Sequence, residues 1–298
     1  MLDDRPAMEN ERTVPHHAPR PTLDFTIATL VTRKNEYEAM KQSFAERGFG
    51  GLDCEFLEID NSGTTQLDAF TGLNRALDMA RGRYVVLCHQ DVRLTHDDRQ
   101  TLTRRLAELT AHDETWAVAG NAGGQAPGRL VLRISDPHTT AITYGALPAR
   151  VSSLDENLLI VRRETGVRFS SDLSGFHFYG TDLCLNAAVR GFSSYIIDFH
   201  LTHLSPGNKD ASFFAAERAF AAKWNRVLSP RWLQTTCAVV PIGGSGLRQS
   251  VSRVIAPVAG RVARRLHRAR LKRHLANAEH GGEADEAVQR RHQLRHAG

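Results

Sequence analysis

The sequence predicts an α/β fold of three layers with a mainly parallel central sheet. Short β-rich runs alternate with helical patterns from Phe25 onward, as expected when strands and helices follow one another. The run from Tyr84 to Cys88 is apolar throughout, which is typical of a parallel strand covered on both faces. With 298 residues, of which 41% are hydrophobic, the chain is long enough to enclose a large core.

The strands are predicted from short apolar, β-branched and aromatic runs bounded by turn residues. A turn at residues 60–63 follows the second strand, and the third strand leads directly into His89. The predicted strands are residues 25–31, 55–59, 84–88, 116–119, 130–134, 158–161 and 194–199.

The helices are predicted where apolar residues recur every three or four positions. Tyr37, Met40 and Phe44 mark the first helix, which the glycines at 48–51 end. We expect Gly82 to end the second helix, and Thr95 with Asp98 to form a capping box before a later one. The other helical stripes lie at residues 67–77, 102–109, 182–190 and 213–224. The segment 168–179 has no such period and is predicted to be a functional loop, or a loop anchored by its aromatic residues.

Three regions are predicted along the chain. Residues 1–22, with four prolines and no apolar period, are expected to be a disordered leader. Residues 23–232 are expected to form the folded domain, and residues 233–298 a basic, helical or partly disordered tail. From Pro241 onward 12 Lys and Arg stand against 4 Asp and Glu, so the tail carries +8 while residues 1–240 carry −3.

The basic tail has an apolar stripe between Leu247 and Leu266, a combination that can lie on an anionic membrane surface. A solvated tail or an oligomer-forming helix are the alternatives, and without a recognised binding motif no nucleic-acid partner is expected. The chain lacks an apolar run of about 20 residues and a secretory signal, which predicts a cytoplasmic protein, either free or peripheral at the inner face of the membrane. Its four cysteines form no CxxC pair, so neither a thiolate zinc site nor a disulfide framework is expected.

Polar side chains follow the first three predicted strands. Ligands of open parallel sheets bind outside the carboxyl ends of the strands, so these residues are the first candidates for a site. The three clusters are Asn35-Glu36, Asp60-Asn61 and His89-Gln90-Asp91.

Two aspartates are candidates for chemistry. Asp91 is either a turn carboxylate or a metal ligand that His203 or His200 would complete, and such mixed oxygen and nitrogen ligation suits Mn²⁺ and tolerates Mg²⁺. Asp182 is either an ordinary carboxylate at a helix N-terminus or a general base.

The order of several short motifs resembles the family 2 glycosyltransferases of GT-A fold, in particular the branch named for the StrF protein of streptomycin biosynthesis. That branch carries His-Gln-Asp-Val in place of the acidic DxD triplet, and the similarity covers about residues 23–225. The motifs are Asn35-Glu36, Phe56-Leu57-Glu58-Ile59-Asp60-Asn61-Ser62, Asn74-Arg75-Ala76-Leu77, His89-Gln90-Asp91-Val92, Leu154-Asp155-Glu156-Asn157, Phe176-His177-Phe178-Tyr179-Gly180-Thr181-Asp182 and His203-Leu204-Ser205.

The resemblance implies a GT-A, Rossmann-like fold and an inverting, metal-dependent transfer of a sugar from a nucleotide-sugar donor to the hydroxyl of a cell-surface glycan or a secondary metabolite. It implies Asp91 and His203 as ligands of Mn²⁺ or Mg²⁺, and Asp182 as the catalytic base. The nucleotide-sugar-binding residues that it implies are Asn35, Glu36, Asp60, Asn61, Asn74, His89, Gln90, Asp91 and Asp155.

The sequence departs from the family where His89 replaces the first acid of DxD and Thr181 replaces the acid before the base. A non-catalytic nucleotide-sugar-binding or assembly protein is therefore the alternative reading.

Overall fold

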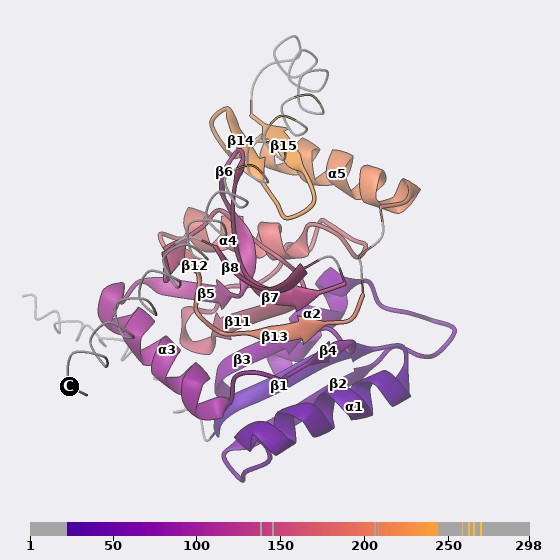
Figure 1. Ribbon diagram of the computed structural model, residues 1–298. Helices are drawn as coiled ribbons and strands as arrows, with labels where there is room; N and C mark the ends of the chain where they lie inside the picture. The colour runs from indigo at the N-terminus through magenta and orange to yellow at the C-terminus, as the bar shows by residue number, and fades with distance from the viewer. Residues whose placement is uncertain are drawn as a thin grey trace, which may run out of the picture.

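The computed structural model describes residues 23–137, 139–144, 146–205, 207 and 209–243 together with positions 258, 262, 265 and 269, and gives the backbone alone for 139–144 (Figure 1). The predicted leader at 1–22 lies outside the described residues, as does nearly all of the predicted tail helix. In the part of the chain that is described, no helix combines the length and the apolar composition needed to cross a membrane.

A seven-stranded sheet forms the centre of the molecule, in the order β2-β1-β3-β11-β5-β12-β9. β1 pairs in parallel with β2 and β3, and β12 in parallel with β5, whereas β11 and β9 run antiparallel to their neighbours. The predicted α/β class with a mainly parallel sheet is thus confirmed. The strands are β1 (Leu23–Val31), β2 (Cys54–Asp60), β3 (Gly82–Cys88), β5 (Trp116–Gly120), β9 (Ala149–Arg150), β11 (Leu158–Arg162) and β12 (Ser193–Ile196).

Helices cover both faces of this sheet because successive side chains of a strand point to opposite sides. On β1, Phe25 and Ile27 pack into one apolar core with α1 and α3, while Ala28 packs into a second core with α2 and α4. This arrangement gives the three predicted layers. The helices are α1 (Lys34–Phe44), extended by the turn η1 (Ala45–Phe49), α2 (Ala69–Met79), α3 (Arg99–His112) and α4 (Tyr179–Val189), and the short turn η2 (Arg163–Thr165) follows β11.

A second sheet, in the order β10-β6-β7-β13-β4 with β8 beside β7, was not predicted as a unit. Several of its strands are too short or too glycine-rich to give a period, as in Ala122–Ala126. Its β13 pairs with β4 so that His203 lies opposite Val92, next to the end of β3. The sheet comprises β4 (Val92–Arg93), β6 (Ala122–Ala126), β7 (Arg129–Asp136), β8 (Thr139–Tyr144), β10 (Ser153–Leu154) and β13 (Leu201–His203).

A third apolar core lies beyond the central sheet. Helix α5 (Ala211–Trp224) packs there against the hairpin of β14 (Arg231–Gln234) and β15 (Val239–Ile242). Packed structure therefore continues to Ile242, past the boundary predicted at residue 232.

Three predicted details differ from the structure. The strand expected at 194–199 ends at Ile196, and a separate strand, β13, carries His203. Asp98 is itself the N-cap of α3, accepting a hydrogen bond from the Thr101 backbone N–H, so no box with Thr95 forms. Gly82 begins β3 instead of ending α2; a Cβ there would lie 2.4 Å from the Thr26 nitrogen, so the close approach of β1 requires glycine.

Candidate functional site

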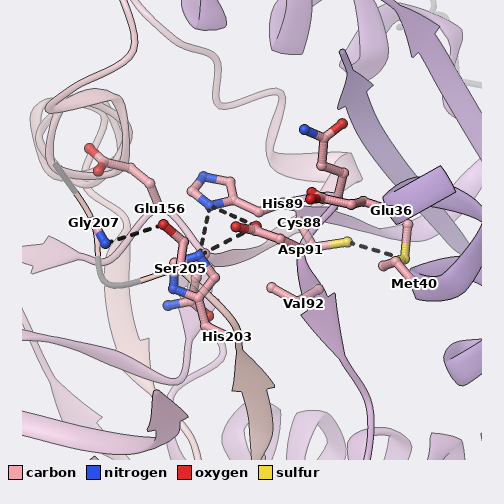
Figure 2. Close-up of polar contacts among 12 residues, drawn as sticks. Glu36, Met40, Cys88, His89, Asp91, Val92, Glu156, His203, Ser205 and Gly207 are labelled. Atoms are coloured by element: carbon pink, nitrogen blue, oxygen red, sulfur yellow. Dashed lines mark hydrogen bonds and ion pairs between the residues drawn. The ribbon is translucent and has the colours of Figure 1, made fainter. Parts of the chain in front are cut away.

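The carboxyl end of β3 and strand β13 bring three metal-ligating side chains together (Figure 2). His89 and Asp91 follow β3 directly, and His203 reaches them from the end of β13. The His89 Nδ1 and His203 Nε2 atoms are 3.3 Å apart, and Asp91 Oδ1 lies 3.4 Å from His203 Nε2 and 3.9 Å from His89 Nδ1. We call these three residues the His-Asp-His cluster.

The geometry of the His-Asp-His cluster fits a divalent metal ion. The point equidistant from its three ligand atoms in their plane lies about 2.1 Å from each, close to ordinary metal–nitrogen and metal–oxygen distances. Two imidazole nitrogens and one carboxylate oxygen suit Mn²⁺ and tolerate Mg²⁺. Among the described residues, no other group of histidine, cysteine and acidic side chains has this convergence.

The charge states of Asp91 and His89 favour cation binding, whereas the hydrogen bond and the charge of Asp91 outweigh burial and raise the pKa of His203, so a bound cation would displace a proton from that ring. Burial opposes the charged form of Asp91, but the hydrogen bond from His203 and the two neighbouring histidines lower its pKa to about 2. Burial and the proximity of His203 lower the pKa of His89 to about 4, which leaves its imidazole neutral at physiological pH. The His89 Nε2 atom is 2.7 Å from the Tyr179 hydroxyl, a contact that orients the ring.

Two cavities meet at the His-Asp-His cluster. The smaller, of about 220 Å³, lies between the ends of β1 and β3 and the start of α2. Its lining residues are Leu30, Thr32, Arg33, Ala69, Leu73, Leu87, Cys88, His89, Gln90, Asp91, Glu156, Phe176 and Tyr179.

The larger cavity, of about 660 Å³, opens on the other side of the cluster. Leu130, Leu132 and Ile134 of β7 form one wall, and the aromatic segment 176–178 contributes to another. His89, Asp91, Glu156 and Phe176 line both cavities. The segment predicted to be a functional loop thus contributes to the site.

Gln90 connects two of the predicted strand-end clusters. Its side-chain oxygen accepts hydrogen bonds from the backbone N–H groups of Thr32 and Arg33, at 3.0 and 2.9 Å. Its amide nitrogen donates to the Thr32 hydroxyl at 2.9 Å. The loop after β1 is therefore fixed to the loop after β3, which shapes one end of the smaller cavity.

Three further predicted residues lie near this edge of the sheet without lining either cavity. Asn35 is exposed in the first turn of α1, and Glu36 pairs with Arg33 at 2.8 Å. Asp60 is exposed at the end of β2 and accepts hydrogen bonds from the backbone N–H and the hydroxyl of Ser62. The structure places none of the three against the His-Asp-His cluster.

Asn61 and Asn74 hold loops in place. The Asn61 amide exchanges hydrogen bonds with the backbone of Leu67, at 2.7 and 3.0 Å, which closes the loop before α2. Asn74 of α2 makes the same double contact with the backbone of Phe169, at 3.0 and 3.1 Å. Because these amides are occupied by backbone partners, the structure gives them supporting positions outside both cavity linings.

Asp155 lines the larger cavity, as expected for a residue near the site. Its Oδ1 accepts hydrogen bonds from the backbone and the side chain of Asn157, and its Oδ2 accepts one from the Thr236 hydroxyl at 2.6 Å. Burial opposes its charge, yet these donors lower its pKa. Asp155 is thus an ionised carboxylate that ties β11 to the β14–β15 turn.

Asp182 does not occupy the position expected of a catalytic base. Its side chain is 0% exposed and lines neither cavity. Ser170 donates to it from its backbone N–H at 2.8 Å and from its hydroxyl at 2.7 Å. Asn186 and the Trp224 indole N–H add donors at 2.9 and 3.0 Å. With both oxygens doubly hydrogen-bonded and lining neither cavity, Asp182 holds the loop, α4 and α5 together.

Of the two histidines considered beside Asp91, the structure brings only His203 to it. His200 is 2% exposed, stacks on His96 with ring centroids 3.9 Å apart, and lies 2.9 Å from the Ser135 hydroxyl. It lines neither cavity.

Glu156 is the site residue that the sequence reasoning did not single out. It lines both cavities, and burial together with Asp155 raises its pKa to about 8. The signal in the sequence was a pair of adjacent acids, Asp155 and Glu156, immediately before an apolar strand.

Comparison with known proteins identifies one curated relative at high similarity. The chain is 36% identical over 231 residues to a protein of Fuscovulum blasticum, and the match covers 75% of this chain and 92% of the relative, which is described as "ATP synthase subunits region ORF 6". No family model matches the chain.

Among solved structures, the S. aureus TarS fragment 1–349 in complex with UDP-GlcNAc is similar with a TM-score of 0.46 at 12% identity, covering 70% of this chain and 68% of that one. GalNAc-T7 with UDP, GalNAc and Mn²⁺ is similar with a TM-score of 0.40 at 9% identity, covering 62% of this chain and 44% of the other. Both similarities have TM-scores below 0.5 and span only part of each chain.

Proposed function

The chain belongs to the same family as the protein of Fuscovulum blasticum described as "ATP synthase subunits region ORF 6", and we propose that it is a metal-dependent glycosyltransferase. It would move a sugar from a nucleotide-sugar donor to the hydroxyl of a glycan or small-molecule acceptor, with inversion at the anomeric carbon. The ion would be Mn²⁺ or Mg²⁺, bound by Asp91, His203 and His89.

The observation that carries this proposal is the position of the His-Asp-His cluster between two cavities, with His89 and Asp91 lining both and His203 lining the larger. A transferase needs one site for the donor, one for the acceptor, and a charged centre where they meet. The smaller cavity lies at the carboxyl ends of parallel strands, where nucleotides bind in open α/β sheets, so we assign it to the donor. The larger cavity is then the acceptor site.

The residues of the chain have distinct tasks in this reaction. Asp91, His89 and His203 would hold the ion, which would supply positive charge to neutralise the departing diphosphate. Tyr179 keeps the His89 ring oriented, with its hydroxyl 2.7 Å from the far nitrogen. Gln90 fixes the two loops that border the donor cavity. Phe176, which is 51% exposed, lines the boundary between the cavities and would contact the transferred sugar.

The test combines metal binding with donor turnover. Thermal unfolding is followed with Mn²⁺ alone and with Mn²⁺ plus each of UDP-glucose, UDP-GlcNAc, GDP-mannose and dTDP-glucose. Ligands that bind the folded state raise its melting temperature. Mn²⁺ alone should therefore raise the melting temperature, and one of the four donors should raise it further in the presence of Mn²⁺. Release of the nucleoside diphosphate from that donor should depend on Mn²⁺.

Asp91→Asn removes the carboxylate charge and should abolish the Mn²⁺-dependent shift and the release of nucleoside diphosphate. The matched control is Asp78→Asn, which changes an exposed carboxylate of α2 that pairs with Arg168 and should keep both. A donor that binds without any turnover would favour the non-catalytic nucleotide-sugar-binding protein. No shift with any of the four donors would contradict the proposal.

A further inference from the structure

We propose that Glu156 is the catalytic base that accepts the proton of the acceptor hydroxyl, an inference that rests on the proposed glycosyl transfer. Asp182 is 0% exposed and lines neither cavity, so another proton acceptor is needed where the two cavities meet. The geometry of the two cavities points to Glu156.

Four acidic residues line the larger cavity, and their positions show which of them is free to act as the base. The lining carboxylates are Asp91, Asp136, Asp155 and Glu156. Asp91 belongs to the His-Asp-His cluster, and Asp155 is occupied by Asn157 and Thr236. Asp136 lies on β7 and does not line the smaller cavity. Among the described residues, Glu156 is the one carboxyl outside the cluster that borders both cavities, where an acceptor oxygen must approach the anomeric carbon.

The start of α4 holds Glu156 in this position. Helix α4 has no side-chain cap of its own, and its N-cap residue Phe178 has a φ of 65°, a left-handed conformation that is uncommon for a residue other than glycine. The backbone N–H groups of Phe178, Tyr179 and Gly180 lie close enough to the Glu156 carboxylate to act against the rise of its pKa. The strained turn thus directs a helix N-terminus at a side chain from another part of the chain.

Gly180 allows this close approach. A Cβ at position 180 would lie 2.5 Å from the Leu154 carbonyl oxygen and 3.3 Å from Glu156 Cγ. The absence of a side chain at position 180 therefore leaves room for Glu156 beside the first turn of α4.

Tyr179 links Glu156 to the metal ligands. Its hydroxyl lies 2.7 Å from His89 Nε2 and 3.4 Å from the Glu156 backbone oxygen (Figure 2 shows His89 and Glu156 on neighbouring segments). The main chain at Glu156 is thus fixed relative to the His-Asp-His cluster. One network would thus position both the base and the metal ligands that face the departing diphosphate. Their relative positions would then stay fixed during transfer.

The environment of Glu156 also suits a base. Burial and the neighbouring Asp155 carboxylate raise its pKa to about 8, against which the three backbone donors act. A general base works best when its pKa lies near the operating pH, because it is then both sufficiently ionised and sufficiently basic.

The chemical step balances without any further reactant. The acceptor oxygen forms a bond to the anomeric carbon while the bond from that carbon to the diphosphate oxygen breaks, and the bonding electrons leave on the diphosphate. The proton of the acceptor hydroxyl moves to a Glu156 oxygen and is later released to water. Water serves as the acceptor in donor hydrolysis.

The experiment separates proton removal from every other role of Glu156. The donor is whichever of the four nucleotide sugars gives the largest Mn²⁺-dependent thermal shift, and release of its nucleoside diphosphate is measured with water and with added azide as the nucleophile. Azide carries no proton to remove. Glu156→Gln should keep the thermal shift with Mn²⁺ and donor, lower the water reaction by about 100-fold or more, and retain the azide reaction.

Two results would overturn the inference: an undiminished water reaction in Glu156→Gln, or loss of the azide reaction together with the water reaction, which would indicate a structural role. If the Gln variant does not fold, Glu156→Asp retracts the carboxylate by one methylene and should show the same split between water and azide. Glu164→Gln, at the opposite end of β11 and 56% exposed, is the matched control and should leave both reactions unchanged.

These outcomes are distinct from failure of the proposed function. If the unsubstituted protein shows no donor-dependent shift and no release of nucleoside diphosphate, the transferase itself is contradicted. If it shows both, and Glu156→Gln behaves like it, the transferase stands and another group is the base.

Discussion

Asp91 and Asp182 are both aspartates of motifs at the edge of the same central sheet, yet their surroundings differ. Asp91 ends a buried strand, has 13% of its side chain exposed, and converges with two histidines at the boundary of two cavities. Asp182 lies in the first turn of α4, is 0% exposed, and accepts hydrogen bonds from Ser170, Asn186 and Trp224. One carboxylate faces space that a ligand can fill, and the other joins three segments of the fold.

The difference shows that an acid at a helix start is an ambiguous signal. Such a residue can interact with the helix dipole, receive a capping network or act on a substrate. At Asp182 the loop and α5 close over the side chain, because Ser170 and Trp224 supply donors from outside α4. The first turn of α4 instead contributes to the site in two ways. Its backbone N–H groups lie near the Glu156 carboxylate, and the Tyr179 hydroxyl contacts His89.

The largest expected effect is on stability, from Asp182→Ala. This change leaves both donors of Ser170 and the indole N–H of Trp224 buried without this acceptor, removes one of the two acceptors of the Asn186 amide, and should lower the free energy of unfolding by about 3–5 kcal/mol. Asp91→Ala should cost clearly less, because the Asp91 side chain pairs, within the described part of the chain, with the two histidines of the cluster alone, and should instead remove the Mn²⁺-dependent thermal shift. Urea unfolding of both variants measures the contrast. Equal losses of unfolding free energy in the two variants would contradict this prediction.

A second prediction concerns the pH dependence of stability, which should differ between a protein with the buried Glu156 carboxyl and one in which only exposed acids titrate. Burial and Asp155 raise the pKa of Glu156 from 4.5 to about 8, so the folded protein holds this proton more tightly than the unfolded chain does. The stabilisation is full below about pH 4.5 and is lost as the pH rises through about 8, amounting to at most a few kcal/mol.

Melting temperatures of the unsubstituted protein and of Glu156→Gln, measured across this pH range, test the second prediction. The Gln variant cannot lose the proton, so its melting temperature should fall less as the pH rises. Parallel curves for the two proteins would mean that Glu156 titrates normally in the folded state.

The smallest expected effect comes from Asn74→Ala, which removes the double hydrogen bond to the Phe169 backbone. The loss should be about 1–2 kcal/mol of unfolding free energy, with the Mn²⁺-dependent thermal shift unchanged, because the amide supports a loop and lines neither cavity. The exposed Asn35→Ala is the control and should stay within about 0.5 kcal/mol. If Asn74→Ala weakened donor binding while stability held, the predicted nucleotide-binding role of Asn74 would be restored.

The sequence was informative where a local pattern decides the structure. The stripe of Tyr37, Met40 and Phe44 predicted α1, and the apolar run ending at Cys88 predicted a buried strand. It was uninformative for short strands such as β4, Val92–Arg93, whose pairing with β13 depends on contacts made more than a hundred residues away. For the same reason the strand expected at 194–199 ends at Ile196, and β13, Leu201–His203, was not predicted.

The residues of the candidate site were likewise predictable from the sequence only in part. Asp91 was predictable because polar residues at the end of a parallel strand face the ligand edge of a sheet. His203 was one of two histidines that the sequence offered as a partner of Asp91, and only the tertiary structure shows that His203 is the one 3.4 Å from it. Glu156 was missed because its exposure to both cavities depends on the strained turn at Phe178 and on the space beside Gly180, neither of which has a period or a motif.

The sequence by itself determined the alternation of strands and helices, the apolar faces that form the layers, and the strand end at which chemistry is expected, since each follows from side-chain periodicity over a few residues. Only the tertiary structure decided which acids face a cavity. The burial of a carboxylate depends on what distant segments place over it: Trp224 and Ser170 cover Asp182, whereas Asp91 and Glu156 remain at the boundary of two cavities.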